Sequence, residues 1–177
     1  MSDTFYSNGK IGYIAAVPKY DSGYAFTYYA GKKYKQNTTA RKQVVNVDGT
    51  KYKALAYDIN KESYFKVTDI AKMFANTSRP FGVKINKSTG EISLDTMAKK
   101  SGTISKSDGK KRTAYPSAAY LTCEGSVIDA LVYRINGEDY VRLSDIGHFL
   151  NCKNFYSNAS KSYFVYTFEC EKSDVEG

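Results

Sequence analysis

Apolar and polar residues follow one order twice along the chain. Residues 54–74 align without a gap on residues 130–150, and the offset is 76 residues throughout. Alanine, leucine, tyrosine, isoleucine, asparagine, glutamate and aspartate recur at equivalent positions. A repeated pattern of this kind indicates one supersecondary unit that the chain builds twice.

The first copy predicts a β-hairpin, a short strand, a helix and a second β-hairpin. The Asp48-Gly49 turn separates two strand-like segments, and apolar residues alternate along the second. A helix is expected from Asp69 to Phe74, with Thr68 as its N-cap. The apolar face of this helix holds Ile70, Met73 and Phe74. The expected strands are residues 44–47, 51–59, 64–66, 81–85 and 91–95.

The second copy predicts the same order of elements. Residues 127–135 are expected to form one arm of its first hairpin, and Asn136-Gly137 the next turn. Ser144 is the expected N-cap of a helix. The inward face of that helix is Ile146, Phe149 and Leu150. The last strand, residues 162–168, alternates so that Phe164, Tyr166 and Phe168 lie on one side.

These patterns predict an α+β fold with five segments. A tyrosine-rich, basic β-hairpin segment (1–43) precedes repeat 1 (44–97), and a basic, Ser/Gly/Lys-rich flexible connector (98–115) leads to repeat 2 (116–170). An acidic tail (171–177) ends the chain. The two copies are expected to pack together, because each helix alone offers a thin core.

Charge is segregated along the chain. The formal net charge is +8, with 17 tyrosines and no tryptophan among 177 residues. Residues 1–46 hold seven Lys/Arg against two acidic residues, and residues 98–115 hold six against one. Residues 116–177 hold five against nine, so the positive excess lies in the N-terminal segment and the connector.

The cysteines and the N-terminus suggest a reducing compartment. Cys123, Cys152 and Cys170 are an odd, sparse set without a CxxC motif, which favours reduced thiols buried as small apolar residues. The N-terminus has no leader-like apolar segment, and no run reaches transmembrane length. We therefore expect a cytoplasmic protein of a bacterial host. The alternative is a secreted or wall-associated protein from which a leader was removed.

The repeated motifs resemble a known family. The segments Tyr57-Asp-Ile-Asn60 with Tyr64-Phe-Lys-Val-Thr-Asp69-Ile, and Tyr133-Arg-Ile-Asn-Gly137 with Tyr140-Val-Arg-Leu-Ser-Asp145-Ile, are similar to the motif of the copper amine oxidase N-terminal-like (stalk) domain of Gram-positive bacteria and their phages. The resemblance covers residues 44–168. Thr68 and Ser144 depart from the family's arginine, and Lys61 departs from its glycine. The resemblance implies a non-catalytic spacer or binding surface.

The candidates for catalysis are weak. The chain has one histidine, His148, so it cannot build a three-histidine copper site, and no metal or cofactor is expected. Asp69 and Asp145 occupy equivalent positions, where a carboxylate suits the positive end of a helix better than an acid–base pair. No phosphate-binding glycine-rich motif is present. We therefore expect a protein that is not an enzyme.

Basic residues interleaved with tyrosines are the better lead to a site. Phosphate groups attract Lys and Arg, and bases or sugars stack on aromatic rings. The candidate ligand-binding residues are Tyr28, Tyr29, Lys32, Lys33, Tyr34, Lys35, Arg41, Lys42, Lys99, Lys100, Lys110, Lys111 and Arg112. We expect them to capture an anionic ligand, either a nucleic acid or a nucleotide.

Three functional hypotheses follow. The first is a phage or mobile-element protein that inhibits a bacterial defence system by holding such a ligand. The second is an extracellular stalk or cell-wall and polymer-binding module. The third is a protein–protein inhibitor that binds a host protein complex without a nucleotide ligand.

Overall fold

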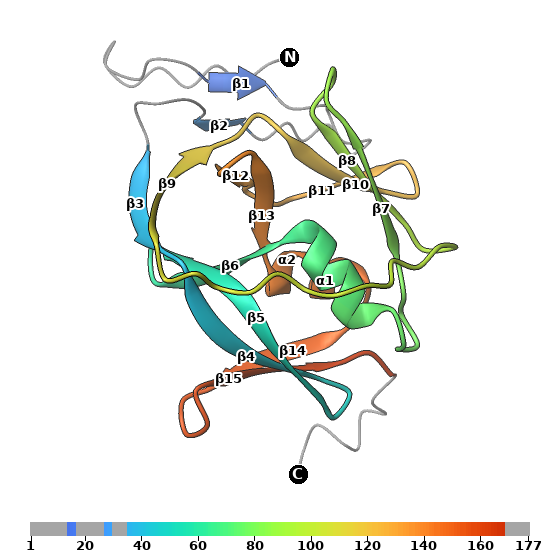
Figure 1. Cartoon of the computed structure of the whole chain (residues 1–177). Coiled ribbons are helices and arrows are strands. Elements are labelled where there is room, and N and C mark those ends of the chain that lie inside the picture. Colours follow the sequence, from blue (N-terminus) through green and yellow to red (C-terminus); the bar gives the residue numbers. More distant parts are fainter. Residues whose placement is uncertain (1–13, 17–26, 30–34, 169–177) are drawn as a thin grey trace.

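The computed structural model describes residues 14–16, 27–29 and 35–168, and shows a mostly β protein with two short helices, of the α+β class (Figure 1). One sheet has nine strands in the order β14 (Lys153–Ser157), β15 (Ser162–Tyr166), β4 (Arg41–Val47), β5 (Thr50–Ile59), β6 (Glu62–Lys66), β13 (Glu138–Arg142), β12 (Tyr133–Ile135), β9 (Lys111–Pro116) and β3 (Gln36–Thr39). A second sheet has the order β11 (Ser126–Ile128), β10 (Tyr120–Cys123), β8 (Glu91–Asp95) and β7 (Gly82–Asn86). The helices are α1 (Val67–Phe74) and α2 (Leu143–Phe149).

The N-terminal segment contributes one two-stranded sheet to the described residues. β1 (Ile14–Ala16) pairs antiparallel with β2 (Thr27–Tyr29), which agrees with the expected hairpin. The rest of residues 1–34 lies outside the described residues, as does the acidic tail. β3 follows as an edge strand of the large sheet.

The nine-stranded sheet curls until its last strand lies beside its middle. Thr38 on β3 donates a hydrogen bond from its hydroxyl to the backbone oxygen of Asp58 on β5, at 2.9 Å. The curled part encloses an apolar cluster of Ala40, Leu55, Tyr57, Ile59, Tyr64, Ala114, Tyr133, Ile135 and Tyr140. The four tyrosines meet edge-to-face in two pairs, with ring centroids 5.2 Å apart for Tyr57–Tyr140 and 5.0 Å for Tyr64–Tyr133. Such edge-to-face geometry suits the ring quadrupoles.

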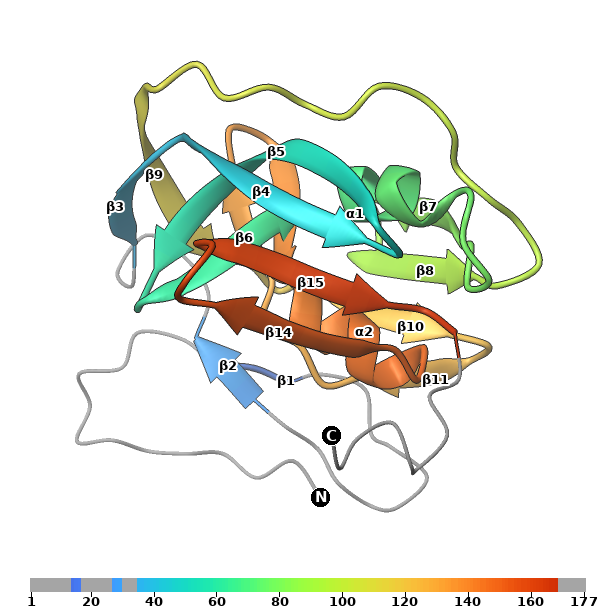
Figure 2. The same ribbon diagram turned by 90° about the horizontal axis from the view of Figure 1, so that it is seen from below.

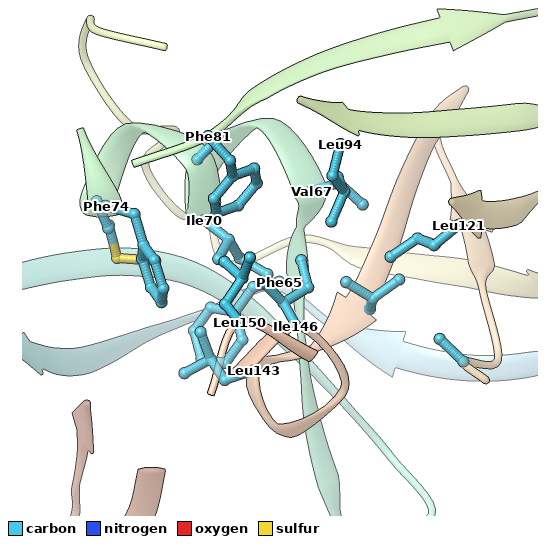
Figure 3. Packing of buried hydrophobic residues seen from close by; sticks show 14 of the residues in the cluster. Phe65, Val67, Ile70, Phe74, Phe81, Leu94, Leu121, Leu143, Ile146 and Leu150 are labelled. Atoms are coloured by element: carbon cyan, nitrogen blue, oxygen red, sulfur yellow. The ribbon is translucent and has the colours of Figure 1, made fainter. Parts of the chain in front are cut away.

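The main core lies between the two sheets and includes both helices. Figure 3 shows Phe65, Ile70, Phe81, Leu121 and Ile146, from different elements, converging on one cluster. Ile70, Met73 and Phe74 are buried as expected from the helical pattern of α1. In α2, Ile146 is buried, as is the C-cap Leu150, but Phe149 is 38% exposed, so the predicted inward orientation of Phe149 was wrong.

Each helix begins one residue before its predicted N-cap. Lys66 and Arg142, the last residues of β6 and β13, hold the N-cap positions with extended backbone and no side-chain cap. Thr68 and Ser144 therefore lie inside the first turn, and their prediction as caps was wrong. The reason is that each strand continues directly into its helix without a turn, so the strand's last residue becomes the cap.

The two closing hairpins each extend a sheet that begins in the other half of the chain. β8 pairs parallel with β10, with Leu121 opposite Ile92. β15 pairs parallel with β4, with Tyr163 opposite Val45. β6 and β13 pair antiparallel at the centre, with Phe65 opposite Val141. The halves are therefore interlaced and share one core.

The segment predicted as a flexible connector is largely held in place. Residues 111–116 form β9, between β12 and β3, so the prediction of a flexible connector was wrong there. Ser105 forms hydrogen bonds with three elements. Its backbone oxygen accepts from the backbone nitrogen of Leu55 at 3.2 Å, and its hydroxyl oxygen accepts from Lys66 Nζ at 3.0 Å. Its backbone nitrogen donates to the Asp69 carboxylate at 3.2 Å. These bonds hold the part of the chain before β9, residues 98–110, across α1, and we name this part the strap (Figures 1 and 2).

The predicted strand 127–135 is interrupted. β11 ends at Ile128 and β12 begins at Tyr133, and the two strands belong to different sheets. Ile128 pairs with Leu121, whereas Tyr133 pairs with Pro116 and Tyr140. The break allows this part of the chain to cross from the small sheet to the large one, whereas β5 stays continuous over ten residues.

Candidate anion-binding site

A surface hollow lies at the β3 edge of the large sheet. Its volume is about 630 Å³. The lining residues are Asn37, Thr38, Thr39, Lys111, Arg112 and Thr113. The antiparallel register of β3 and β9 places Thr39 opposite Lys111 and Thr38 opposite Arg112. Thr39 and Lys111 therefore share one face of the ladder, together with Asn37 and Thr113, and Thr38 and Arg112 share the other.

Two lysines give this hollow its positive charge. Lys110 and Lys111 are exposed and form no ion pair with the described residues. Arg112 is partly neutralised, because its Nη2 lies 2.6 Å from Asp108. The backbone N–H of Lys110 and the Arg112 guanidinium both hold the pKa of the Asp108 carboxyl below its usual range, so this carboxylate stays charged. The net positive charge at the hollow therefore comes from Lys111, which lines it, and from Lys110, the residue before Lys111.

The beginning of β4 adjoins this end of β9. The backbone nitrogen of Ala40 donates to the backbone oxygen of Lys110 at 2.9 Å. Arg41 and Lys42, the first residues of β4, therefore follow a residue that is bonded beside the hollow. Arg41 forms a fork on Asp58, with N···O distances of 2.6 and 2.8 Å, and also contacts Ser63. Burial opposes the ionisation of Asp58, but the bonds from Arg41 and Ser63 outweigh it and lower the pKa of that carboxyl. Arg41 is therefore a structural ion-pair residue, and Lys42 remains exposed.

The other predicted ligand residues are spread more widely. Lys35 is exposed just before β3. Lys99 and Lys100 follow β8, and Lys110 directly precedes β9. Figures 1 and 2 show the segment between β8 and β9 as a long connection. Tyr28 and Tyr29 belong to β2, and Lys32, Lys33 and Tyr34 lie outside the described residues. Of the predicted ligand residues, the structure thus brings together those at β9 and those at the start of β4. Lys99 and Lys100, at the other end of the strap, are separated from them.

The equivalent carboxylates of the two helices each have a structural partner. Asp145 accepts a fork from Arg142, with N···O distances of 2.7 and 3.0 Å. Asp69 is fully buried, accepts the Ser105 N–H, and lies 3.6 Å from Lys72 Nζ. Asp145 therefore anchors the strand–helix junction, and Asp69 anchors the strap.

The candidate nucleophiles and metal ligands do not assemble. Cys123 and Cys152 are buried and unpaired, as expected, and Cys170 lies outside the described residues. Burial raises the pKa of the Cys152 thiol to about 11 and also raises the pKa of Cys123, which disfavours the reactive thiolate. His148 is exposed. Within residues 14–16, 27–29 and 35–168, no three His, Cys, Asp or Glu side chains gather as a metal site would require.

Comparisons with known proteins leave the family undecided. The chain matches no protein-family model, no curated protein and no solved structure. The resemblance to the stalk domain therefore stays a prediction. Of the helices in the described part of the chain, neither has the length and apolar character needed to cross a membrane.

Proposed function

We propose that this protein is a non-catalytic module that binds an anionic ligand, either a nucleic acid or a nucleotide. The observation that carries the proposal is the hollow on β3 and β9, where Lys111 and Arg112 line a polar depression and Lys110 lies next to it. A phosphate placed there would meet ammonium groups, threonine hydroxyls and the Asn37 amide, which are its usual partners in proteins. The rigid β-ladder beneath fixes these groups in position.

We also infer that the chain consists of two tandem copies of one unit. Three register relations support this. With the 76-residue offset, Phe65 and Val141 are equivalent, and they pair with each other at the centre of the large sheet. The Tyr57–Tyr140 and Tyr64–Tyr133 contacts exchange under the same offset and have nearly equal geometry. Residues 44–47 and 120–123, also equivalent, each pair parallel with the last strand of the opposite copy.

The hollow predicts salt-dependent binding that the double variant Lys110→Ala/Lys111→Ala weakens. For a single-stranded nucleic acid, each lysine that neutralises a phosphate contributes about 0.7 to the slope of log affinity against log salt. The variant should therefore lose about 1.4 from that slope, with no preference for sequence. The measurement is fluorescence anisotropy with labelled RNA, DNA and cyclic nucleotides across a salt series.

The matched control is Lys84→Ala/Lys87→Ala, two exposed lysines at the β7–β8 hairpin, which lies in the other sheet. Both double variants lower the net charge of the protein by the same amount. A similar loss of affinity in both would therefore indicate a general charge effect and contradict a site on β9. Absence of binding at low salt, or affinity that does not respond to salt, would refute the proposed function itself.

A further inference from the structure

A row of aromatic rings lies on the outer face of the β14–β15 hairpin; Phe155 and Phe168 are exposed, and Phe164 and Tyr166 are half-buried. Phe155 and Phe164 stack across the two strands with centroids 5.3 Å apart and an interplanar angle of 14°. Tyr166 lies 6.2 Å from Phe155, and Phe168 lies 5.7 Å from Tyr166. Phe155 is 43% exposed and Phe168 is 52% exposed. Large apolar side chains that gather in the open like this are typical of a binding surface.

The outward rings on β15 point away from the hydrophobic core. Along β15, Tyr163 and Val165 point inward, where Tyr163 meets Phe65 and Val165 is buried. Phe164 and Tyr166 alternate with them and so point outward. The rings therefore contribute little to the packing between the two sheets.

Lysines surround the row on the neighbouring strands. Figure 2 shows β14, β15, β4 and β5 side by side, in the order of the sheet. Register places Phe164 opposite Asn46, which is opposite Lys51. It also places Lys153 opposite Tyr166. Paired residues share a face, so the aromatic face, as we name it, consists of Phe155, Phe164, Tyr166 and Phe168 with Lys51, Lys53 and Lys153, and Lys42 continues it along β4.

The charge of this face identifies the kind of partner. The charged side chains that the register places on it are all lysines. The nearby Asp48 is already occupied, because it accepts hydrogen bonds from the backbone and hydroxyl of Thr167. Lysine is depleted at protein–protein interfaces, and a neutral polysaccharide gains nothing from ammonium groups. Rings bordered by cations suit a partner that has both flat faces and phosphates.

We infer that the aromatic face binds single-stranded nucleic acid, with bases stacked on the rings and phosphates at the lysines. Unpaired bases expose their faces, whereas a duplex buries them, so this surface selects single strands. Every base has such a face, so recognition is largely independent of sequence. The aromatic face is built on β14, β15, β4 and β5 and the hollow on β3 and β9, and Lys42 alone was placed beside both, so this inference rests on other residues than the hollow does.

The test measures the affinity of the full chain for single-stranded DNA and RNA, for a duplex of the same sequence and for a neutral polysaccharide. We expect preference for single strands. Phe155→Ala should lower single-strand affinity about tenfold, the usual loss per stacked base. Phe149→Ala is the matched control, since Phe149 is similarly exposed but lies on α2. It should leave affinity unchanged.

A second pair of variants tests the charged part without altering an aromatic ring. Lys51→Gln/Lys53→Gln should reduce the salt dependence of single-strand binding, whereas Lys84→Gln/Lys87→Gln should not. Circular dichroism establishes that each variant is folded. Equal affinity for duplex and single strand, unchanged affinity in Phe155→Ala, or polysaccharide binding that Phe155→Ala abolishes would each overturn the inference. Loss of binding in Lys110→Ala/Lys111→Ala alone would concern only the hollow.

Discussion

Replacing Phe65 with alanine is expected to lower the free energy of unfolding by about 3–5 kcal/mol, the usual cost of removing a buried phenyl ring. Phe65 is fully buried and lies opposite Val141, where β6 meets β13. It also packs edge-to-face on Tyr163, with centroids 5.7 Å apart. The cavity left by alanine would therefore open at the point where both halves of the chain meet. Since domains are stable by only about 5–15 kcal/mol, this is a large share of the total.

The measurement is urea unfolding at equilibrium, compared with Met97→Ala. Met97 is 91% exposed, so its replacement should change stability by less than about 0.5 kcal/mol. Fluorescence and circular dichroism should report one shared transition, because the two halves have one core. A Phe65→Ala variant that loses less than about 1 kcal/mol would contradict the continuous core described here. So would two separate transitions.

Alkaline pH is expected to unfold the protein steeply. Burial raises the pKa of all four phenols enclosed by the curled sheet, and the effect is largest for Tyr64 and Tyr140. In the unfolded chain these phenols titrate near pH 10. Below that pH they are protonated in both states and their contribution to stability is complete. Above it the unfolded state releases protons that the folded state retains, so stability falls as pH rises toward the folded pKa values.

Each retained proton changes the unfolding free energy by 1.36 kcal/mol per pH unit, so four phenols together give a slope of up to about 5 kcal/mol per pH unit. The measurement combines urea unfolding at a series of pH values with tyrosinate absorbance. The double variant Tyr64→Phe/Tyr140→Phe removes two of the four groups and should reduce the slope to about half. The same slope in the variant and the parent would show that the enclosed tyrosines are not responsible.

Local patterns predicted the elements well where turn chemistry is strong. Asn60 and Asn136 both adopt positive φ at the expected turns, and Asp48 and Gly49 do so at the first hairpin. The helical spacing of Ile70, Met73 and Phe74 correctly gave the buried face of α1. These features depend on a few neighbouring residues, so the local sequence contains the information that they need.

The longer-range arrangement left no such local signal. Nothing in residues 91–95 indicates that their partner on one side is β10 rather than a strand of the same copy, because main-chain hydrogen bonds join any two extended segments. The Ser/Gly/Lys-rich composition of residues 98–115 predicts a flexible connector, although its last residues belong to β9 and Ala114 is buried in the sheet. In each case burial is decided by segments distant in sequence.

The candidate site was predicted in part. The sequence identified the charge excess that includes Lys110, Lys111 and Arg112, but it could not show that Asp58 and Asp108 neutralise Arg41 and Arg112. The aromatic face had a visible signal in the alternation of Phe164, Tyr166 and Phe168, which the structure bears out. The alternation could not show that neighbouring strands place Phe155 and the lysines of the aromatic face on the same side of the sheet.

The pairing of β15 with β4 has a consequence during protein synthesis. Beside this pair, the Gln43 side chain on β4 donates a hydrogen bond to the backbone oxygen of Lys161, the residue before β15, which lies 118 positions away in the sequence. A ribosome that adds about 5–20 residues per second needs roughly ten seconds to cover that distance. For that time the edge of β4 has no permanent neighbour, and it is open to strands of other nascent chains. Efficient production of this protein in a cell therefore depends on what protects that edge until the final hairpin emerges.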